Sequence, residues 1–504
     1  MHELSLSDAL CSSIAKYKEL AAIRAGGVEI SYATIGDGID ALRATLSQSP
    51  FDEARPQRIA IMTNRDVETY AAIYGLIALG HSYVPLNPAW PVERLSMILD
   101  RADVDAVIYS AGPRISGLVG ALQERHSLPF VKLAHEGGVF RVDCEGVRSE
   151  PRNMATDVPG LAYIMFTSGS TGVPKGVPIT RANVEAYVAA IIGQYPFEAG
   201  DRVVQTVEMT FDLSVHDMML SWVQGCCLLS VPANASQLAP RLIAQQGGTH
   251  WLTVPSAAAQ AKILGLLKPG AMPSMKTLMF CGEALPQSLA LACAEAAPNA
   301  KLVNIYGPTE ATIAISAYDW TEARTRELDV VPLGEPIGEQ QISLSAEGEI
   351  MLSGTQLSSG YLNDPEKTQD RFRIIGGRRW YLTGDLGAFD PNHGFIFRGR
   401  MDSQIKLRGY RIELGDVEVA LRQVADTDLV AAIATDSDAP SSYRKLAGFI
   451  AGSPLSMEEI GEAVAKKLPP YMVPDRLIAI ADVPLNANGK VDYVSLRKRL
   501  EEAS

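Results

Sequence analysis

A chain of 504 residues, 47% of them hydrophobic and 20% charged, is too long for one ordinary core and predicts a soluble protein with two or more domains. Its formal net charge of −13, without a lysine/arginine block, argues against nucleic acid as a partner, because that binding needs a concentrated basic face. Six cysteines in so long a chain match neither a disulfide framework nor a zinc-binding pattern, so a reduced cytoplasmic setting fits best.

The N-terminal part of the chain contains no recognisable targeting or membrane segment. Met1–Leu4 lacks the basic start and apolar core of a signal peptide. The longest stretch without Asp, Glu, Lys or Arg runs from Thr69 to Val92 and is interrupted by glycines and prolines. A buried helix followed by a strand explains it better than a membrane span. We therefore expect a cytoplasmic protein without membrane insertion.

Short β-rich runs alternate with helical stretches over the first 300 or so residues. The expected strands are Arg58–Met62, Ala106–Tyr109, Leu161–Phe166, Val203–Val207, Cys227–Val231, Trp251–Val254, Thr277–Phe280 and Lys301–Ile305. Helices are expected at Asn183–Ile192 and Gln287–Ala296. This alternation predicts an α/β fold of mostly parallel sheets covered by helices.

The pattern changes towards the C-terminus. Short strands broken by turn residues are expected at Gln341–Leu344, Glu349–Leu352, Arg379–Leu382 and Phe395–Phe397, with a strong turn signal at Asp390–Gly394. Past Arg400 the pattern is α+β, with helices near Leu414–Val424 and Met457–Lys467. We predict a large N-terminal domain, 1–400, with an antiparallel β subdomain at about 320–400, and a small mobile C-terminal domain, 401–504.

The segment from Thr167 to Gly176 follows the apolar run Leu161–Phe166 and reads TSGSTGVPKG. Its glycines allow backbone N–H groups to approach anionic oxygens, its hydroxyls add neutral donors, and Lys175 adds a mobile positive charge. It is not a Walker A loop, because Pro174 precedes the lysine and a glycine follows it. The alternative is a solvated Gly/Ser linker, which the preceding strand disfavours. The segment predicts a phosphate-binding loop.

Four further motifs follow in order. Asn304–Glu310 follows a buried strand, where Tyr306 could stack on a base and Glu310 could hold Mg²⁺ through hard oxygen ligands. Tyr381–Asp385 places a carboxylate where ribose hydroxyls could be hydrogen-bonded. Gly399–Gly409 begins the small domain, and Asn488–Lys490 places a lysine on a tight turn.

In this order the motifs resemble those of the adenylate-forming superfamily, which comprises acyl-CoA synthetases, luciferases and the adenylation domains of nonribosomal peptide synthetases. The resemblance covers essentially the whole chain. Segments 211–215, 279–283 and 306–313 are most similar to amino-acid adenylation enzymes, in particular to free-standing D-alanine–D-alanyl carrier protein ligases. The resemblance implies two steps: ATP and a carboxylate give an acyl-adenylate, and the thiol of a phosphopantetheine arm then takes the acyl group.

The resemblance also implies ATP and Mg²⁺ as cofactors. The ATP-binding residues that it implies are Thr167, Ser168, Gly169, Ser170, Thr171, Gly172, Lys175, Gly282, Glu283, Asn304, Ile305, Tyr306, Gly307, Pro308, Thr309, Asp385, Phe397, Arg400 and Lys490. Lys490 would be catalytic by bridging carboxylate and phosphate oxygens, Glu310 would be catalytic through the magnesium ion, and Asp402 matches the hinge between the domains.

Each of these roles has a structural alternative. Lys490 could be a solvated turn lysine, and Asp385 could cap a turn. Arg400 and Glu310 could pair as ordinary surface charges. The hinge at Asp402 needs a permissive backbone rather than a particular side chain.

Asp212 discriminates best between substrates. A buried carboxylate is costly unless it meets a cation, and in amino-acid adenylation enzymes the matching aspartate pairs with the substrate α-ammonium. The alternative is a helix N-cap. The amino-acid pocket implied by the resemblance comprises Asp212, Leu213, His216, Thr253, Met279, Cys281, Ile305, Ile313, Ala314 and Lys490. This mostly apolar lining implies a small or modestly sized neutral amino acid.

Two of these positions bear on the identity of the amino acid. Cys281 is shared with D-alanine ligases, although a lone cysteine is often a small buried hydrophobe. His216 departs from those ligases, which carry an apolar residue there. It could be a satisfied core histidine, a donor to a polar substrate group, or a filler that shortens the pocket. D-Alanine, L-alanine, serine, threonine, proline and nonproteinogenic relatives all stay open.

The predicted function is therefore ATP-dependent activation of a small neutral amino acid, D-alanine or similar, and its transfer to a separate phosphopantetheinylated carrier protein. No Gly-Gly-x-Ser carrier signature follows Lys490, which favours a carrier in trans. An acyl- or aryl-CoA synthetase of the same fold is the first alternative, and Asp212 argues against it. A catalytically inactive adenylation-like binding subunit is the second.

Overall fold

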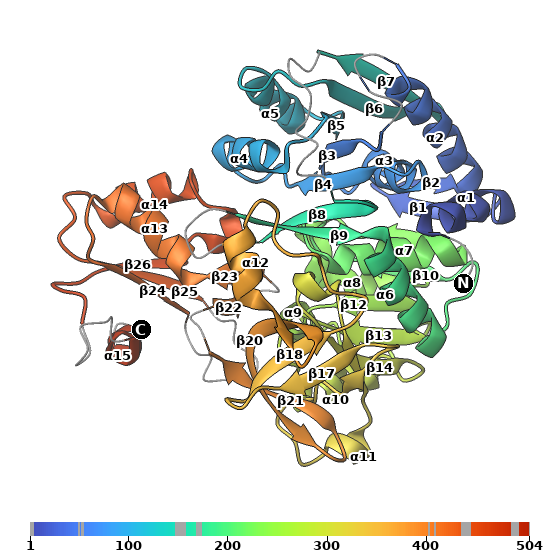
Figure 1. The fold of residues 1–504 in the computed structure, drawn as a ribbon. Coiled ribbons are helices and arrows are strands. Elements are labelled where there is room, and N and C mark those ends of the chain that lie inside the picture. Colours follow the sequence, from blue (N-terminus) through green and yellow to red (C-terminus); the bar gives the residue numbers. More distant parts are fainter. Residues whose placement is uncertain are drawn as a thin grey trace. The chain divides into compact units, whose positions relative to one another are not determined.

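The computed structural model describes residues 5–48, 51, 55–146, 158–167, 174–401, 404–407, 410–434, 445–484 and 493–502. The chain divides into two compact units (Figure 1). The larger unit comprises Met1–Pro88, Ile98–Phe166 and Gly176–Met401, and the smaller comprises Ala89–Met97, Thr167–Lys175 and Asp402–Ser504. Within the described ranges, no helix combines the length and apolar character needed to cross a membrane.

A seven-stranded sheet is formed early in the chain, in the order β7-β6-β5-β3-β4-β8-β9. Its strands are β3 (Arg58–Met62), β4 (Ser82–Leu86), β5 (Ala106–Ser110), β6 (Phe130–Glu136), β7 (Val139–Glu145), β8 (Leu161–Thr167) and β9 (Lys175–Thr180). The strands from β6 to β8 pair in parallel, and β7 is antiparallel to β6. Helices α3 (Val67–Ala78), α4 (Val92–Ala102) and α5 (Pro113–Gln123) connect them. The uncharged stretch 69–92 thus forms a buried helix and strand, as predicted.

A nine-stranded sheet follows, in the order β16-β15-β14-β13-β12-β10-β11-β1-β2. Its strands are β1 (Ala21–Ala25), β2 (Val28–Ser31), β10 (Arg202–Gln205), β11 (Cys227–Ser230), β12 (His250–Thr253), β13 (Thr277–Phe280), β14 (Lys301–Tyr306), β15 (Ser316–Asp319) and β16 (Glu335–Pro336). Its helices are α1 (Leu6–Lys16), α2 (Tyr32–Leu46), α6 (Arg181–Gln194), α7 (Leu213–Gln224), α8 (Ala239–Gln246), α9 (Pro255–Ile263), α10 (Gln287–Ala296) and α11 (Glu322–Thr325). The six strands from β14 to β1 are parallel, so the prediction of mostly parallel sheets is confirmed.

Strand alternation gives the nine-stranded sheet two different apolar faces. Leu252, Met279 and Val303 are aligned in register and belong to the core that contains buried residues of α6 and α7. Trp251 and Leu278 project to the opposite face, where the second core contains buried residues of α9 and α10. Because side chains alternate along a strand, the residues facing α6 and α7 recur at every second position.

The predicted antiparallel region forms a five-stranded sheet. Its elements are β17 (Gln341–Leu344), β18 (Glu349–Ser353), α12 (Pro365–Arg371), β19 (Phe372–Ile375), β20 (Arg378–Asp390) and β21 (Gly394–Arg400). Asp390 and Gly394 are paired across the β20–β21 turn, and the Asp390 carboxylate accepts a hydrogen bond from the Asn392 N–H at 2.8 Å. The turn signal read from the sequence is confirmed.

The C-terminal part of the smaller unit is α+β. Its elements are β22 (Gln404–Leu407), β23 (Tyr410–Glu413), α13 (Leu414–Ala425), β24 (Val430–Ala434), β25 (Leu446–Ile450), α14 (Met457–Ala465), β26 (Arg476–Ala479) and α15 (Tyr493–Glu502). It has its own apolar core, in which α13 and α14 contribute Val417, Leu421 and Ile460.

Candidate functional site

The carboxyl ends of β12, β13 and β14 lie at one edge of the nine-stranded sheet, because these neighbours are parallel. Ligands of open α/β sheets bind at this edge. Met279, Cys281 and Ile305 belong to the core on the α6/α7 face. Thr253 is in register with Phe280, so strand alternation places it on the face opposite Met279. Of the four expected pocket residues at the ends of these strands, Met279, Cys281 and Ile305 therefore share one face of the sheet, and Thr253 does not.

Asp212 immediately precedes α7 and is buried. It occupies the N-cap position, but its side chain makes no capping hydrogen bond to the helix. The carboxylate instead accepts a hydrogen bond from the Ile313 N–H at 3.3 Å and one from the side chain of Thr309. The capping alternative is therefore not supported, and the carboxylate is directed to the 309–313 segment.

The electrostatic environment of Asp212 disfavours its charge. Burial raises the pKa of the Asp212 carboxyl to about 6, and the nearby carboxylate of Glu310 adds to that rise. The hydrogen bonds from Thr309 and Ile313 act in the opposite direction and only partly offset burial. A cation placed beside Asp212 would restore its charged form.

The backbone that contacts Asp212 is held in an unusual conformation. Thr312 and Ile313 have positive φ angles of 55° and 72°, which is uncommon for residues with a Cβ. The buried side-chain amide of Gln356 donates to the carbonyl oxygens of Ala311, Thr312 and Ala314, at 3.3, 3.2 and 2.7 Å. Gln356 therefore stabilises the 311–314 segment, which forms one wall of the expected substrate pocket. Sequence reading missed it, because it lies 42 or more residues from its partners.

Gly307 lies against the same wall. A Cβ at this position would stand 2.6 Å from the Cα of Ala314 and 2.9 Å from the carbonyl oxygen of Ile313. We expect Gly307→Ala to displace the wall, lower the melting temperature by several degrees and raise the KM for the carboxylate substrate at least tenfold, since overpacking costs about 1–3 kcal/mol. Melting curves and steady-state kinetics measure this. Gly120→Ala is the control, because a Cβ there meets no atom within 4 Å; equal behaviour of the two variants would contradict the expectation.

Asp385, Tyr306 and Arg400 form a buried polar cluster. The Tyr306 hydroxyl donates to Asp385 Oδ2 at 2.6 Å, and Arg400 pairs with Asp385 Oδ1. The side chains of Asp385 and Arg400 are 4% and 11% exposed, so neither is an ordinary surface charge. The cluster joins the end of β14 to β20 and β21. Two donors therefore fix the orientation of the carboxylate that is expected to bind ribose.

Glu310 is 1% exposed, which excludes a surface ion pair. Its Oε1 atom accepts a hydrogen bond from the Tyr361 hydroxyl at 2.7 Å. Mg²⁺ is commonly held by one or two carboxylates together with phosphate oxygens, so a single buried carboxylate with a fixed orientation fits this ion. The hydrogen bond from Tyr361 orients the Glu310 carboxylate, and the sequence analysis did not identify this residue.

Other residues expected at the nucleotide have structural contacts of their own. The Asn304 amide donates to the carbonyl oxygens of Val331 and Pro332, at 3.3 and 2.8 Å. Glu283 accepts a hydrogen bond from the Ser256 N–H in the first turn of α9, at 2.8 Å. These side chains thus stabilise the loops next to the strand ends.

The remaining expected positions are placed by single observations. Gly282 has a φ of 91°, which favours glycine. Phe397 is on β21 and partly buried, and Pro308 precedes the short 3₁₀ turn 309–311. Leu213 and Ala314 are buried. Thr167 ends β8, and Lys175 Nζ lies 3.5 Å from Glu413 Oε1 within the smaller unit. Ser168, Gly169, Ser170, Thr171, Gly172, Asp402 and Lys490 lie outside the described residues.

A cavity of about 460 Å³ lies at the start of α12 and the loop before it, and none of the expected site residues lines it. Its lining residues are Val158, Pro178, Ser359, Gly360, Tyr361, Leu362, Asn363, Asp364, Pro365, Thr368 and Gln369.

Known proteins are similar to this chain over most of its length. The family model of AMP-binding enzymes matches residues 11–362. The D-alanine–D-alanyl carrier protein ligase of Lacticaseibacillus rhamnosus is 31% identical over 93% of this chain and 94% of its own length, and that of Bacillus cereus is 29% identical over 94% of each. Among solved structures, the Vibrio cholerae adenylation domain AlmE in complex with glycyl-adenosine-5'-phosphate is 28% identical, with a TM-score of 0.86 over 99% of this chain and 98% of that one.

Proposed function

The chain belongs to the AMP-binding enzyme family, and from that premise we propose that it activates a small neutral amino acid with ATP and loads it onto the phosphopantetheine thiol of a separate carrier protein. The family resemblance read from the motifs is confirmed. Relatives named D-alanine–D-alanyl carrier protein ligase and the AlmE complex with glycyl-adenosine-5'-phosphate support an amino acid with a very small side chain as the substrate.

The proposal that the substrate is an amino acid rests on one observation. Asp212 is a buried carboxylate whose identified partners are neutral donors, the Ile313 N–H and the Thr309 side chain. Such a group is destabilised in its charged form until a cation reaches it. The α-ammonium of an amino acid supplies that cation, whereas fatty and aryl acids carry none.

The proposed reaction has two balanced steps. First, a carboxylate oxygen of the amino acid attacks the α-phosphorus of ATP, the bond to the bridging oxygen breaks, and pyrophosphate leaves. Second, the carrier thiolate attacks the carbonyl carbon of the adenylate, a thioester forms, and AMP leaves. Since two anions must meet in the first step, catalysis consists mainly of positioning and charge neutralisation.

The chain's own residues would share these tasks. We propose that Asp385, fixed by its two donors, binds the ribose hydroxyls, and that the ring of Tyr306 stacks on the base. Glu310 would hold Mg²⁺, which when bound neutralises phosphate charge. The 167–172 loop and Lys490 would bind the phosphates, and Lys490 would also neutralise the substrate carboxylate.

The first experiment is amino-acid-dependent ATP–pyrophosphate exchange over a panel of D- and L-amino acids, glycine, and fatty and aryl acids. We expect strong exchange with one or a few small neutral amino acids, and none with Lys490→Ala. Exchange only with acids that lack an amine would overturn the role of Asp212, and thioester formation on coenzyme A rather than on a carrier protein would overturn the proposed acceptor.

A further inference from the structure

The side chain of His216 lies one helical turn beyond Asp212. Its backbone N–H donates to the Asp212 carbonyl oxygen at 3.4 Å at the start of α7, so the two residues share one face of the helix. Residues at this spacing have Cβ atoms about 5–6 Å apart. His216 is 2% exposed, and its imidazole therefore occupies the interior next to the proposed ammonium site.

Tyr187 of α6 holds this imidazole. The Tyr187 hydroxyl lies 2.6 Å from His216 Nδ1, and the Tyr187 side chain is fully buried. Burial lowers the pKa of His216 to about 3, with a further contribution from His250, so the imidazole is neutral at physiological pH. Tyr187 belongs to the same apolar core as Met279 and Cys281, which line the strand-end side of the pocket. A neutral hydrogen bond between two buried rings thus fixes the orientation of His216.

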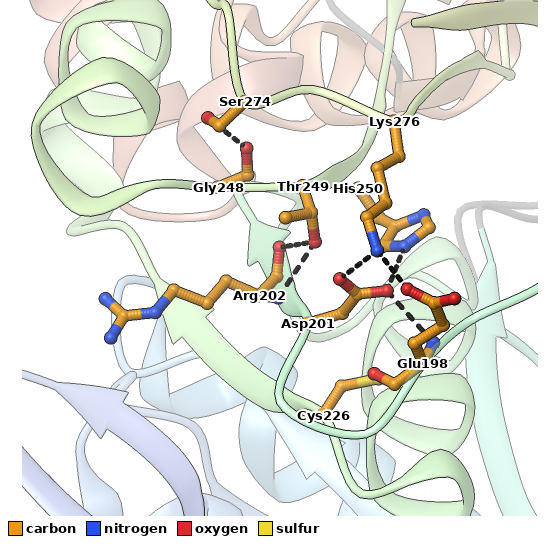
Figure 2. A network of polar contacts seen from close by, with 9 residues as sticks. All are labelled: Glu198, Asp201, Arg202, Cys226, Gly248, Thr249, His250, Ser274 and Lys276. Carbon is orange, nitrogen blue, oxygen red and sulfur yellow. Dashed lines mark hydrogen bonds and ion pairs between the residues drawn. The ribbon is translucent and has the colours of Figure 1, made fainter.

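Aromatic contacts also restrict the ring of His216. The ring of Phe197 lies 6.5 Å from that of His216 and stacks on His250 at 4.1 Å. His250 Nε2 is 3.0 Å from Asp201 Oδ2, and Lys276 Nζ is 2.8 Å from Asp201 Oδ1 (Figure 2). The network therefore runs from a half-exposed lysine to a ring that contacts His216. The imidazole is confined on two sides.

From this geometry we infer that the His216–Tyr187 pair closes the amino-acid pocket and limits the substrate to glycine, alanine and serine, with Tyr187 as the positioning residue. The inference rests on the proposed function. An ammonium hydrogen-bonded to Asp212 would lie about 2.8 Å from its carboxylate, and the α-carbon is one bond further. His216 lies one helical turn further along the same face, where its imidazole would meet a substrate side chain that extends more than a short way from the α-carbon.

The test is the ratio of kcat/KM for alanine to that for 2-aminobutyrate, measured by pyrophosphate exchange. Glycine, both enantiomers of alanine, serine and 2-aminobutyrate, and valine complete the panel. We expect wild type to favour the smaller substrates at least about tenfold, because one methylene in a pocket is worth about 10–200-fold. His216→Ala should lower the ratio tenfold or more through the KM of the larger amino acids, with the KM for ATP unchanged.

Tyr187→Phe keeps the ring and removes the hydrogen bond, so it should lower the same ratio several-fold without changing the KM for ATP. Tyr74→Phe is the matched control: Tyr74 of α3 is fully buried and donates to the carbonyl oxygen of Leu10 on α1, at 2.8 Å. Its ratio should equal that of wild type. The Tyr187 variant keeps the test decisive if His216→Ala fails to fold.

Three outcomes would overturn the inference while leaving amino-acid activation intact: wild type prefers valine, both variants retain the wild-type ratio, or Tyr74→Phe changes it as much as Tyr187→Phe does. Absence of exchange with every amino acid would overturn the proposed function and the inference together. The two failures are therefore distinguishable.

Discussion

Asp212→Asn is expected to reduce amino-acid-dependent pyrophosphate exchange at least about 100-fold while leaving the KM for ATP within a few-fold of wild type. The amide keeps an acceptor for the Ile313 N–H but removes the charge that the substrate ammonium would meet. Loss of the partner of a buried charge typically costs several kcal/mol, which is more than 100-fold in affinity. Exchange assays and calorimetric titration with ATP separate the two effects. Equal losses for the amino acid and for ATP would point to a structural role.

The same variant should be more stable than wild type above about pH 6. The pKa of the Asp212 carboxyl is raised from 3.8 to about 6 in the folded protein, so the folded state binds the proton more tightly than the unfolded state does. Folding stability from this group is therefore lost as the pH rises from about 4 to about 6, by about 3 kcal/mol in total. Asparagine removes that loss. Denaturation midpoints at pH 4 and pH 8 should show the difference growing with pH.

Asp217 provides a matched control on the same helix. It is fully buried, and burial raises the pKa of its carboxyl well above 3.8. Asp217→Asn should likewise remove a loss of stability with rising pH, because the pKa of this carboxyl is also raised on folding, but we expect the amino-acid KM to stay at the wild-type value, because Asp217 is not among the residues expected at the substrate. If Asp217→Asn reduced amino-acid-dependent exchange as much as Asp212→Asn does, the assignment of Asp212 to the substrate ammonium would fail.

Asp385→Ala is expected to abolish measurable ATP binding and also to destabilise the fold. Its carboxylate is the acceptor for Tyr306, which is buried, and the ion-pair partner of Arg400, whose side chain is 11% exposed. Removing it leaves a buried guanidinium without its carboxylate, at a cost of about 3–5 kcal/mol. It also removes the proposed ribose contact. Thermal unfolding with and without ATP should show a lower melting temperature and no stabilisation by the nucleotide.

The partly buried ion pair between Asp105 and Arg55 provides a control for the loss of stability without a loss of ATP binding. Asp105 accepts hydrogen bonds from Arg55 at 3.2 and 2.7 Å and from the Arg58 N–H at 2.7 Å, on the seven-stranded sheet. Asp105→Ala should lower the melting temperature by a similar amount but retain the ATP-induced increase. Retention of that increase in Asp385→Ala as well would contradict the ribose assignment.

Much of the fold was readable from local patterns. Continuous apolar runs flanked by turn residues predicted eight parallel-sheet strands, such as Arg58–Met62 and Thr277–Phe280, because strands buried on both faces have no polar side. Less regular elements were not anticipated, among them β1 and β2 and the β6–β7 hairpin. The exposed positions of β7 leave it without a clear apolar signal.

The sequence by itself determined the family, the order of the motifs and the residue types at the site, because these depend on short segments such as 167–176 and 304–310. Only the tertiary structure decided which side chains act together. Tyr187 meets His216 across 29 residues, Tyr306 meets Asp385 across 79, and the Ile313 N–H meets Asp212 across 101. Such partners are brought together by strand order and helix packing, and no local spacing in the chain records them.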